Sequence, residues 1–248
     1  MQAATATKGA ISIRNVTKIY DPEGVNVMAV DDCSLEIAPG EVCMIVGPSG
    51  CGKTTLLNAI AGFHSITSGE IYLDGEMLCG PDKPIADQGA DRMVVFQNGA
   101  LFPWKTLLEN VAYGPIVQGI MGKKEARDKA QDILAEAGLA DFSMKFPGEV
   151  SSGMSRRAEI VRALINDPKV LLLDEPTEGI QPNIISEIGR VLKFLTAEKG
   201  MTILLVEQYL DFVREYTDDF YIMNRGEIVA SGETAKLEDE TISKYLSV

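Results

Sequence analysis

Apolar positions in this chain fall into short runs separated by Gly and Pro, and the first of these runs predict strands. Residues 11–20, ISIRNVTKIY, alternate like an edge strand, whereas residues 41–47, EVCMIVG, form a β-rich run of buried-strand length. Residues 69–76, GEIYLDGE, predict a hairpin that turns at an Asp-Gly pair. The opening part of the chain is therefore expected to be rich in β-structure.

Later apolar positions predict helices and a second kind of strand. Residues 54–62, TTLLNAIAG, have helical spacing and end at a glycine, and residues 123–139 have one apolar face with charges elsewhere. Residues 170–175, VLLLDE, and 202–207, TILLVE, are almost wholly apolar and flank an amphipathic segment at 184–195. This order is typical of central parallel strands joined by a crossover helix, with functional residues at the carboxyl ends of the strands.

Composition supports one globular α/β domain. The 248 residues are 46% apolar, which is enough to bury a large core, and no internal repeat or low-complexity tract interrupts them. With 36 acidic and 23 basic residues the net charge is -13. Nucleic acid is therefore not an expected partner, because a negative surface repels phosphate backbones.

The sequence also lacks the marks of membrane insertion, secretion and metal-binding cysteines. No apolar run approaches the roughly 20 residues that a membrane helix needs, and the N-terminus has neither the basic start nor the apolar centre of a signal peptide. We therefore expect a cytoplasmic protein. Cys33, Cys43, Cys51 and Cys79 form no CxxC pair, so reduced and mostly buried thiols are expected rather than a zinc site or disulfides.

A phosphate-binding loop follows the buried strand. The segment GPSGCGKTT fits GxxxxGK[ST] with a strand before it and a helix after it. Its glycines let backbone N–H groups surround phosphates, while Lys53 reaches the β- and γ-phosphate oxygens and Thr54 ligates Mg²⁺. An ordinary glycine-rich turn is the alternative, but chance matches rarely have the strand, the helix and an acidic partner strand together. The candidate ATP-binding residues of the loop are Gly47, Pro48, Ser49, Gly50, Cys51, Gly52, Lys53, Thr54 and Thr55.

The acidic partner is the pair Asp174-Glu175, which ends the apolar run VLLLDE. Asp174 is expected to hold Mg²⁺ directly or through water, and Glu175 is expected to polarise the attacking water as a general base. Two acids that close an apolar strand can also be simple solvent-facing residues. The phosphate-binding loop favours the catalytic interpretation.

Together with GALFPW shortly after Gln97 and VSSGMSRRAEIVRAL before the acidic strand, these motifs make the chain resemble the ATP-binding subunits of ABC transporters over nearly its whole length. The resemblance implies ATP and Mg²⁺ as cofactors. It also implies a P-loop NTPase (RecA-like) α/β core with an antiparallel β portion and a helical insert, of ABC ATPase type. In this single nucleotide-binding domain, 1–248, the core and β portion are expected at 1–97 and 158–248. The insert, with the signature motif, is expected at 98–157.

The resemblance also assigns individual residues. Tyr20 matches the aromatic residue that stacks on adenine, and Gln97 matches the glutamine that ligates Mg²⁺ and links its site to the permease. Ser151 and Gly153 keep the signature motif, which in the family completes the ATP site of a second subunit in a head-to-tail dimer. Hydrogen bonds to charged groups contribute roughly 1.5–3 kcal/mol each, so two sandwiched nucleotides can hold such a dimer closed. The second ATPase subunit is either another copy or a related chain.

Transmembrane permease subunits are the other partners that the resemblance implies. In the family they insert a short coupling helix into a groove near the glutamine loop and the helical insert, so the chain is expected at the inner face of the cell membrane. The region from Gln97 to Trp104 is expected to make this contact. The candidates to line the groove are Leu101, Phe102, Pro103 and Trp104, the only tryptophan. An aromatic cluster that simply packs in the core is the alternative.

The resemblance changes along the chain. Residues from about 27 to 176 look like the ATPases of nitrate, taurine and alkanesulfonate importers, whereas residues from 177 look like those of urea and branched-chain amino acid importers. Natural recombination or drift and a deliberately built chimera both explain the join, and the built chimera is slightly favoured. In either case the resemblance implies ATP hydrolysis coupled to uptake of a small solute, with the permease contacts following the first portion.

Three positions depart from the family pattern. Ser152 replaces a glycine of the signature motif, where a Cβ is expected to crowd a phosphate or to demand a disfavoured backbone angle. Gln181 replaces an aspartate that helps each site sense the other, and Gln208 stands where most members carry a histidine. The amide of Gln208 donates a hydrogen bond but carries no charge and relays no proton. His64, the only histidine, is not expected to substitute for it.

These departures leave two functional alternatives. One is an importer ATPase with Glu175, Lys53 and Gln208 as catalytic residues, slow as a homodimer and natively paired with a histidine-bearing partner. The other is a module that binds ATP and dimerises with weak or no hydrolysis.

Two further features carry less information about function. Arg156-Arg157 are predicted to lie on a solvated face rather than to pack near the signature helix or pair with acids. The thiol of Cys51 is expected to be incidental.

Overall fold

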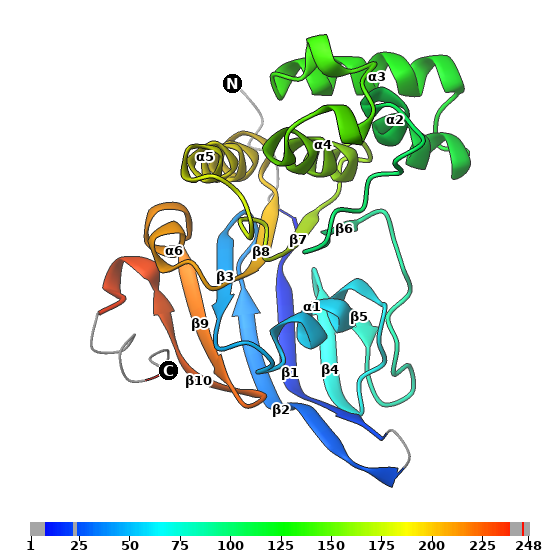
Figure 1. Ribbon diagram of the computed structural model, residues 1–248. Coiled ribbons are helices and arrows are strands. Elements are labelled where there is room, and N and C mark those ends of the chain that lie inside the picture. Colours follow the sequence, from blue (N-terminus) through cyan, green and yellow to red (C-terminus); the bar gives the residue numbers. More distant parts are fainter. Residues whose placement is uncertain (1–7, 22–23, 239–244, 246–248) are drawn as a thin grey trace, which may run out of the picture.

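The computed structural model describes residues 8–21, 24–238 and 245, which form two sheets with a group of helices above them (Figure 1). The strands are β1 (Ile11–Tyr20), β2 (Val27–Ile37), β3 (Val42–Val46), β4 (Ser68–Leu73), β5 (Glu76–Cys79), β6 (Arg92–Val95), β7 (Val170–Asp174), β8 (Thr202–Glu207), β9 (Asp219–Asn224) and β10 (Glu227–Glu233). The helices are α1 (Lys53–Ala61), α2 (Leu107–Val117), α3 (Lys123–Glu136), α4 (Ser152–Leu164), α5 (Pro182–Lys199) and α6 (Leu210–Tyr216), with short 3-10 turns η2 (Ala140–Phe142), η3 (Pro147–Glu149) and η4 (Thr234–Lys236).

The larger sheet has the strand order β10-β9-β3-β8-β7-β6, and only β10 runs antiparallel to its neighbour. Strands β3, β7 and β8 are buried at every residue, which explains why their sequences are continuous apolar runs rather than alternating ones. Val46 pairs with Glu207, and Asp174 pairs with Val206. The predicted central parallel strands are confirmed, and their carboxyl ends meet at one edge.

The smaller sheet is antiparallel, with the order β2-β1-β4-β5. Its β4–β5 hairpin turns at Asp74 and Gly75, whose φ angles are 53° and 79°. Positive φ at both central residues is what a two-residue type I′ turn requires, and Asp-Gly is a favoured sequence for it. The hairpin predicted from the sequence is therefore confirmed.

Three apolar clusters hold the layers together. One lies between the two sheets and includes α1, and a second covers the other face of the larger sheet with α5 and α6. The third joins α2, α3 and α4, the green helices grouped at one end of the molecule (Figure 1). Helix α4 runs across residue 157 and contributes Ala158 and Val161 to this third cluster. The division into a core and an insert at 98–157 remains a prediction.

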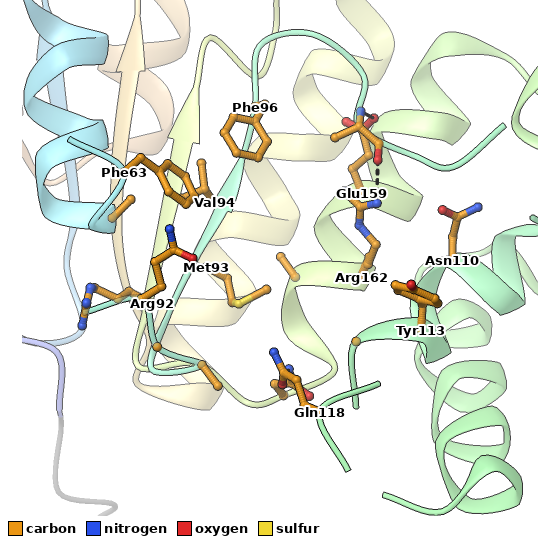
Figure 2. Close-up of a pocket in the computed structure, with 18 of the residues that line it drawn as sticks. Phe63, Arg92, Met93, Val94, Phe96, Asn110, Tyr113, Gln118, Glu159 and Arg162 are labelled. Atoms are coloured by element: carbon orange, nitrogen blue, oxygen red, sulfur yellow. Dashed lines mark hydrogen bonds between the residues drawn. The ribbon is translucent and has the colours of Figure 1, made fainter. Parts of the chain in front are cut away.

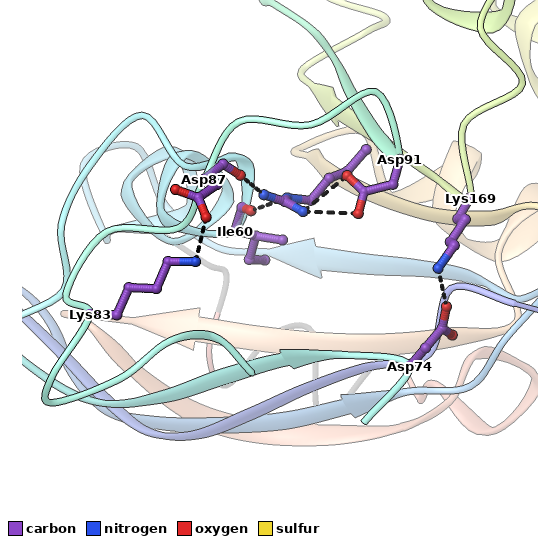
Figure 3. Close-up of polar contacts among 7 residues, drawn as sticks. Ile60, Asp74, Lys83, Asp87, Asp91 and Lys169 are labelled. Carbon is purple, nitrogen blue, oxygen red and sulfur yellow. Dashed lines mark hydrogen bonds and ion pairs between the residues drawn. The ribbon is translucent and has the colours of Figure 1, made fainter. Parts of the chain in front are cut away.

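Buried Arg92 in β6 binds both α1 and the segment that leads from β5 of the smaller sheet to β6 of the larger one. Its Nε donates to the carbonyl oxygen of Ile60 in α1 at 2.9 Å, and its side chain pairs with Asp91 at 3.0 Å (Figure 3). Lys169, just before β7, donates to Asp74 in the β4–β5 turn at 2.9 Å. Exposed ion pairs contribute at most about 1 kcal/mol, so the buried bonds of Arg92 matter more for this connection.

The structure also bears on the membrane and cysteine predictions. Within the described ranges, no helix is both long and apolar enough to cross a bilayer. All four cysteines are buried and free, as expected. Burial raises the pKa of Cys33, beside Asp32, to about 12 and that of Cys79 to about 11, so these two thiols stay protonated at neutral pH.

Helix α5 begins without a side-chain cap, and this can be corrected by one substitution. Gln181 is its N-cap residue and accepts no capping hydrogen bond through its side chain. We expect Gln181→Asp to stabilise the fold by about 1 kcal/mol, because a short carboxylate accepts from the first free N–H groups and favours the positive helix end. Urea unfolding at pH 7 measures the change, with Gln181→Glu as the control that is too long to cap. Equal unfolding midpoints for the two variants would contradict the expectation.

Candidate functional site

The phosphate-binding loop connects β3 to α1 and is tightly enclosed by neighbouring backbone. A Cβ built on Gly52 would lie 2.1 Å from the carbonyl oxygen of Ala29, and one on Gly47 would lie 2.1 Å from that of Met223. Gly52 also has a φ of 108°, which side chains rarely adopt. These glycines are therefore required by contact and by backbone angle.

Lys53 lies under the loop rather than in solvent. It is 4% exposed, and its Nζ donates to the carbonyl oxygens of Gly47 at 2.8 Å and Pro48 at 3.1 Å. Cys51 Sγ lies 4.0 Å from the same Nζ, and burial raises the pKa of this thiol although the Lys53 charge lowers it. Binding of a triphosphate requires the ammonium to exchange loop carbonyls for phosphate oxygens.

A hydroxyl and a carboxylate face each other beside the loop. Thr54 Oγ1 donates to Asp174 Oδ1 at 3.0 Å, so two of the three predicted metal ligands are adjacent. Burial raises the pKa of Asp174; the hydrogen bond from Thr54 lowers it, and the neighbouring charge of Glu175 raises it further. Oxygen donors of this kind fit Mg²⁺, which prefers carboxylate and hydroxyl oxygens together with water and phosphate.

Glu175 is the centre of a hydrogen-bond cluster. Gln97 Nε2 donates to Glu175 Oε2 at 3.0 Å, and Gln208 Nε2 donates to Glu175 Oε1 at 2.8 Å. Gln97 also donates to Glu178 Oε2 at 2.7 Å. Glu175 has a φ of 45°, a left-handed conformation that costs a residue with a Cβ roughly 1 kcal/mol or more and that marks a constrained position.

Two carboxylates in this region were missed from the sequence. Glu178 reaches Gln97, and buried Glu207 accepts from the backbone N–H groups of Thr177 at 2.8 Å and Gln208 at 2.9 Å. Thr177 also donates its hydroxyl to Glu207. The sequence signal was present for Glu207, because it ends the apolar run TILLVE on a central strand. It fixes the backbone on both sides of the cluster.

A pocket of about 280 Å³ lies between the phosphate-binding loop and the hydrogen-bond cluster on Glu175. Its lining consists of Ala29, Ser49, Gly50, Gly52, Lys53, Thr54, Thr55, Gln97, Glu175, Glu178 and Gln208. Most of the predicted loop residues thus face the same space as the predicted general base. Gly47, Pro48 and Cys51 do not line it and instead contact the ammonium of Lys53.

Tyr20 and the signature residues lie apart from this pocket. The Tyr20 ring has Lys18 Nζ at 4.7 Å and meets the edge of the His64 ring at 6.0 Å. Ser151 caps α4 by accepting from the N–H of Met154 at 3.3 Å, and it is exposed. These residues do not line the pocket of their own chain, so their predicted roles toward adenine and a second subunit remain predictions.

Ser152 adopts an ordinary helical conformation at the start of α4. It is not among the residues with positive φ in the described part of the chain, so the predicted disfavoured backbone angle does not occur. The next residue is the constrained one: a Cβ on Gly153 would lie 2.7 Å from Ile184 Cγ2 in α5. The physical reason is that the helix has already begun, and its backbone accepts any L residue at this position.

The prediction of a solvated face for Arg156 is wrong. Arg156 is 6% exposed, and its guanidinium pairs with Glu159 at 2.9 Å while donating to the carbonyl oxygens of Phe96 at 2.6 Å and Gln97 at 2.7 Å. Charged residues are buried when their donors are satisfied in this way. Arg157 is less buried and reaches the carbonyl oxygen of Ala137 at 3.1 Å.

A groove of about 610 Å³ lies between the larger sheet and the helical layer (Figure 2). Phe63 and Phe96, stacked 5.7 Å apart, form one side, while Asn110 and Tyr113 lie on the other. Phe102 lines this groove. Three neighbours of Phe102 lie outside this lining: Leu101, Pro103 and Trp104. The contact of the four residues with a permease remains a prediction. Leu101 packs on the helical cluster, and Trp104 is 70% exposed with its ring 5.5 Å from that of Phe102.

Comparisons with known proteins agree with this geometry. The sequence pattern of the ABC transporter family matches residues 30–178, more than half of the chain. The taurine import ATP-binding protein TauB of Roseobacter denitrificans is 42% identical over 198 residues, covering 79% of this chain and 70% of TauB. The glutamine transport ATP-binding protein GlnQ of Escherichia coli is 38% identical over 224 residues, covering 90% of each chain. The chain therefore belongs to the ABC transporter family.

Solved structures show the same fold. A dimeric post-hydrolysis state of the ATP-binding cassette MJ0796 bound to ADP and Pi has a TM-score of 0.80 and 31% identity, covering 92% of this chain and all of that one. The ADP conformation of the cassette MJ1267 has a TM-score of 0.80 and 30% identity, covering 96% and 94%. The chain has the P-loop fold of ABC ATPases, as predicted, and is an ATP-binding, ATP-hydrolysing member of the family.

The glycine contacts of the loop give a testable difference between two neighbouring positions. Gly52→Ala should destabilise the fold by about 3 kcal/mol or more, because its Cβ meets backbone and its φ is unfavourable. Gly50 has a φ of 76° but nothing within 4 Å of its Cβ position, so Gly50→Ala should cost only about 1–2 kcal/mol. Urea unfolding of both variants measures this, and equal losses would show that the close approach to Ala29 is unimportant.

Proposed function

We propose that this chain is the ATP-hydrolysing subunit of an importer that takes up a small solute through separate permease subunits. The observation that carries the proposal is the convergence of Gln97 and Gln208 on Glu175, in one pocket with Lys53 and Thr54. The names of the similar proteins, which are import or transport ATP-binding proteins, support it.

Each group of the pocket has a task in this reaction. Glu175 accepts the proton of the attacking water, and Gln208 holds the carboxylate of Glu175 in place through its amide. Lys53 stabilises the charge on the γ-phosphate once it leaves the loop carbonyls. Thr54, Gln97 and Asp174 would hold Mg²⁺, which when bound neutralises phosphate charge.

The signature residues serve a second ATPase subunit. Ser151 is exposed at the N-terminus of α4, where free N–H groups and the helix dipole favour a phosphate. It does not line the pocket of its own chain, whereas the similar cassette MJ0796 is dimeric with ADP and Pi. In a head-to-tail dimer, formed with another copy or a related chain, the N-terminus of α4 contacts the nucleotide of the other subunit. Tyr20 is assigned to stacking on adenine.

The groove beside Phe102 is the docking site for a permease. It is lined by aromatic rings on both sides and lies next to Gln97 through Phe96. Contact there would place the chain against the cytoplasmic face of the membrane. TauB is named for taurine import and GlnQ for glutamine transport, and both names support a small solute as the cargo.

The comparisons give no support to the binding-only alternative, and the hydrogen bonds of Gln97 and Gln208 to Glu175 support hydrolysis. Gln208 donates to the general base at 2.8 Å although it lacks the charge of a histidine.

The role of Glu175 is tested by Glu175→Gln. The amide is nearly isosteric but accepts no proton, so turnover should fall by about 100-fold or more while ATP binding is retained. Phosphate release and equilibrium binding of a fluorescent ATP analogue measure the two effects, with exposed Glu198→Gln as a control. Undiminished turnover would remove Glu175 from the role of general base.

The importance of Gln208 is tested by Gln208→His. A histidine supplies the charge and proton relay that the amide lacks, so turnover should rise by about tenfold, equivalent to about 1.4 kcal/mol of barrier. Steady-state phosphate release at saturating ATP measures the change. If turnover does not rise, Ser152 or Gln181, the other two departures from the family pattern, limits the rate of hydrolysis instead.

A further inference from the structure

We propose that Arg156 and Glu159 are positioning residues for Gln97. They fix the loop that holds Gln97 to the signature helix α4, so that this loop follows any movement of α4. The proposal rests on the proposed function, because Gln97 is assigned to the nucleotide site there. It goes further by naming the residues that set the place of Gln97.

The contacts act on both sides of Gln97. Arg156 donates one N–H to Phe96 O at 2.6 Å and another to Gln97 O at 2.7 Å. Glu159 Oε1 accepts from the N–H of Ala100 at 2.9 Å, while its Oε2 holds Arg156 at 2.9 Å. We call the segment from residue 96 to residue 101 the glutamine loop and the Arg156–Glu159 pair its clamp.

The clamp is buried, so its geometry is defined. Arg156 is 6% exposed and Glu159 is 5% exposed, and their spacing of three residues places both on the same face of α4. A buried ion pair is weak evidence for stability, because apolar residues of similar volume often stabilise as well. The pair instead fixes the orientation of the loop backbone. A planar guanidinium holds two carbonyl groups at fixed angles, which an apolar side chain cannot do.

The clamp joins the loop to the exposed signature end of the same helix. Arg156 lies five residues after Ser151, about 7.5 Å along a rigid helix. Arg162, on the same helix, donates to the carbonyl oxygen of Ala100 at 2.6 Å, and Figure 2 shows Glu159 and Arg162 reaching from α4 toward the loop. The glutamine loop therefore forms one body with α4.

Gln97 then links this body to the catalytic edge of the sheet. Its backbone is held by Arg156, while its side-chain amide donates to Glu175 and Glu178. A shift of α4 changes the position of the Gln97 backbone and so the reach of its amide to these carboxylates. The clamp is the contact through which the signature helix acts on Gln97.

The test uses Arg156→Lys, which keeps the buried charge beside Glu159 but replaces the two-pronged guanidinium by a single ammonium. Hydrogen exchange in the peptide from residue 96 to residue 101, measured without nucleotide, should become about tenfold faster, because hydrogen bonds from a charged donor are lost. The half-saturating Mg²⁺ concentration for ATP turnover should rise about fivefold while the thermal midpoint changes little. Arg157→Lys, the neighbouring arginine that does not touch the glutamine loop, is the matched control and should change neither quantity.

Several outcomes would overturn the proposal. Unchanged exchange in residues 96–101, or faster exchange with unchanged Mg²⁺ dependence, would show that the clamp does not position Gln97. If Arg156→Lys does not fold, Glu159→Gln replaces it: this variant keeps an acceptor for Ala100, and it should show smaller changes in the same two quantities. No change in Glu159→Gln contradicts the proposal. Absence of turnover in the unaltered chain would instead count against the proposed function.

Discussion

The parallel pairing of β3, β7 and β8 is the constraint on which the rest of the structure depends. All three strands are buried at every residue, and their register places Val46 beside Glu207 and Asp174 beside Val206. A one-residue slip would exchange the side chains of the two buried faces and disturb the packing of both apolar layers, so close packing fixes this register. The ends of the three strands therefore deliver the phosphate-binding loop, the acidic pair and Gln208 to the same edge.

This edge is shaped by contacts that strands alone do not supply. Buried Glu207 accepts from the backbone N–H groups of Thr177 and Gln208. Glu175, two residues before Thr177, keeps a left-handed conformation. Arg156 holds the loop of Gln97 from the opposite side. The site is thus assembled from the sheet and from the signature helix, and the two parts meet at the amide of Gln97.

The sequence was sufficient for the features that are local. The apolar runs predicted the central strands, the Asp-Gly pair predicted the hairpin, and the loop motif predicted the place of Lys53 because strand, turn and helix are written in adjacent residues. Arg156 was misjudged, because a charged residue is expected at the surface and its partners lie about 60 positions earlier in the chain. Its burial is a consequence of packing, which sequence pattern does not contain.

The same limit applies to the groove. Leu101, Pro103 and Trp104 adjoin Phe102 in sequence, yet only Phe102 among these four lines the groove, because the irregular loop directs neighbouring side chains to different surroundings. No motif marks Glu178. Its contact with Gln97 joins two loops that lie 81 positions apart in the chain, with α2, α3 and α4 between them. Tertiary contacts decide which polar residues near a motif take part in the site.

The central claim is that ATP bound at this edge is completed by the signature end of a second subunit. Sedimentation velocity of the Glu175→Gln chain, with Mg²⁺ and either ATP or ADP, tests it most directly, because the trapped triphosphate supplies the contacts that ADP lacks. We expect a dimer with ATP and a monomer with ADP. The same species with both nucleotides would contradict it.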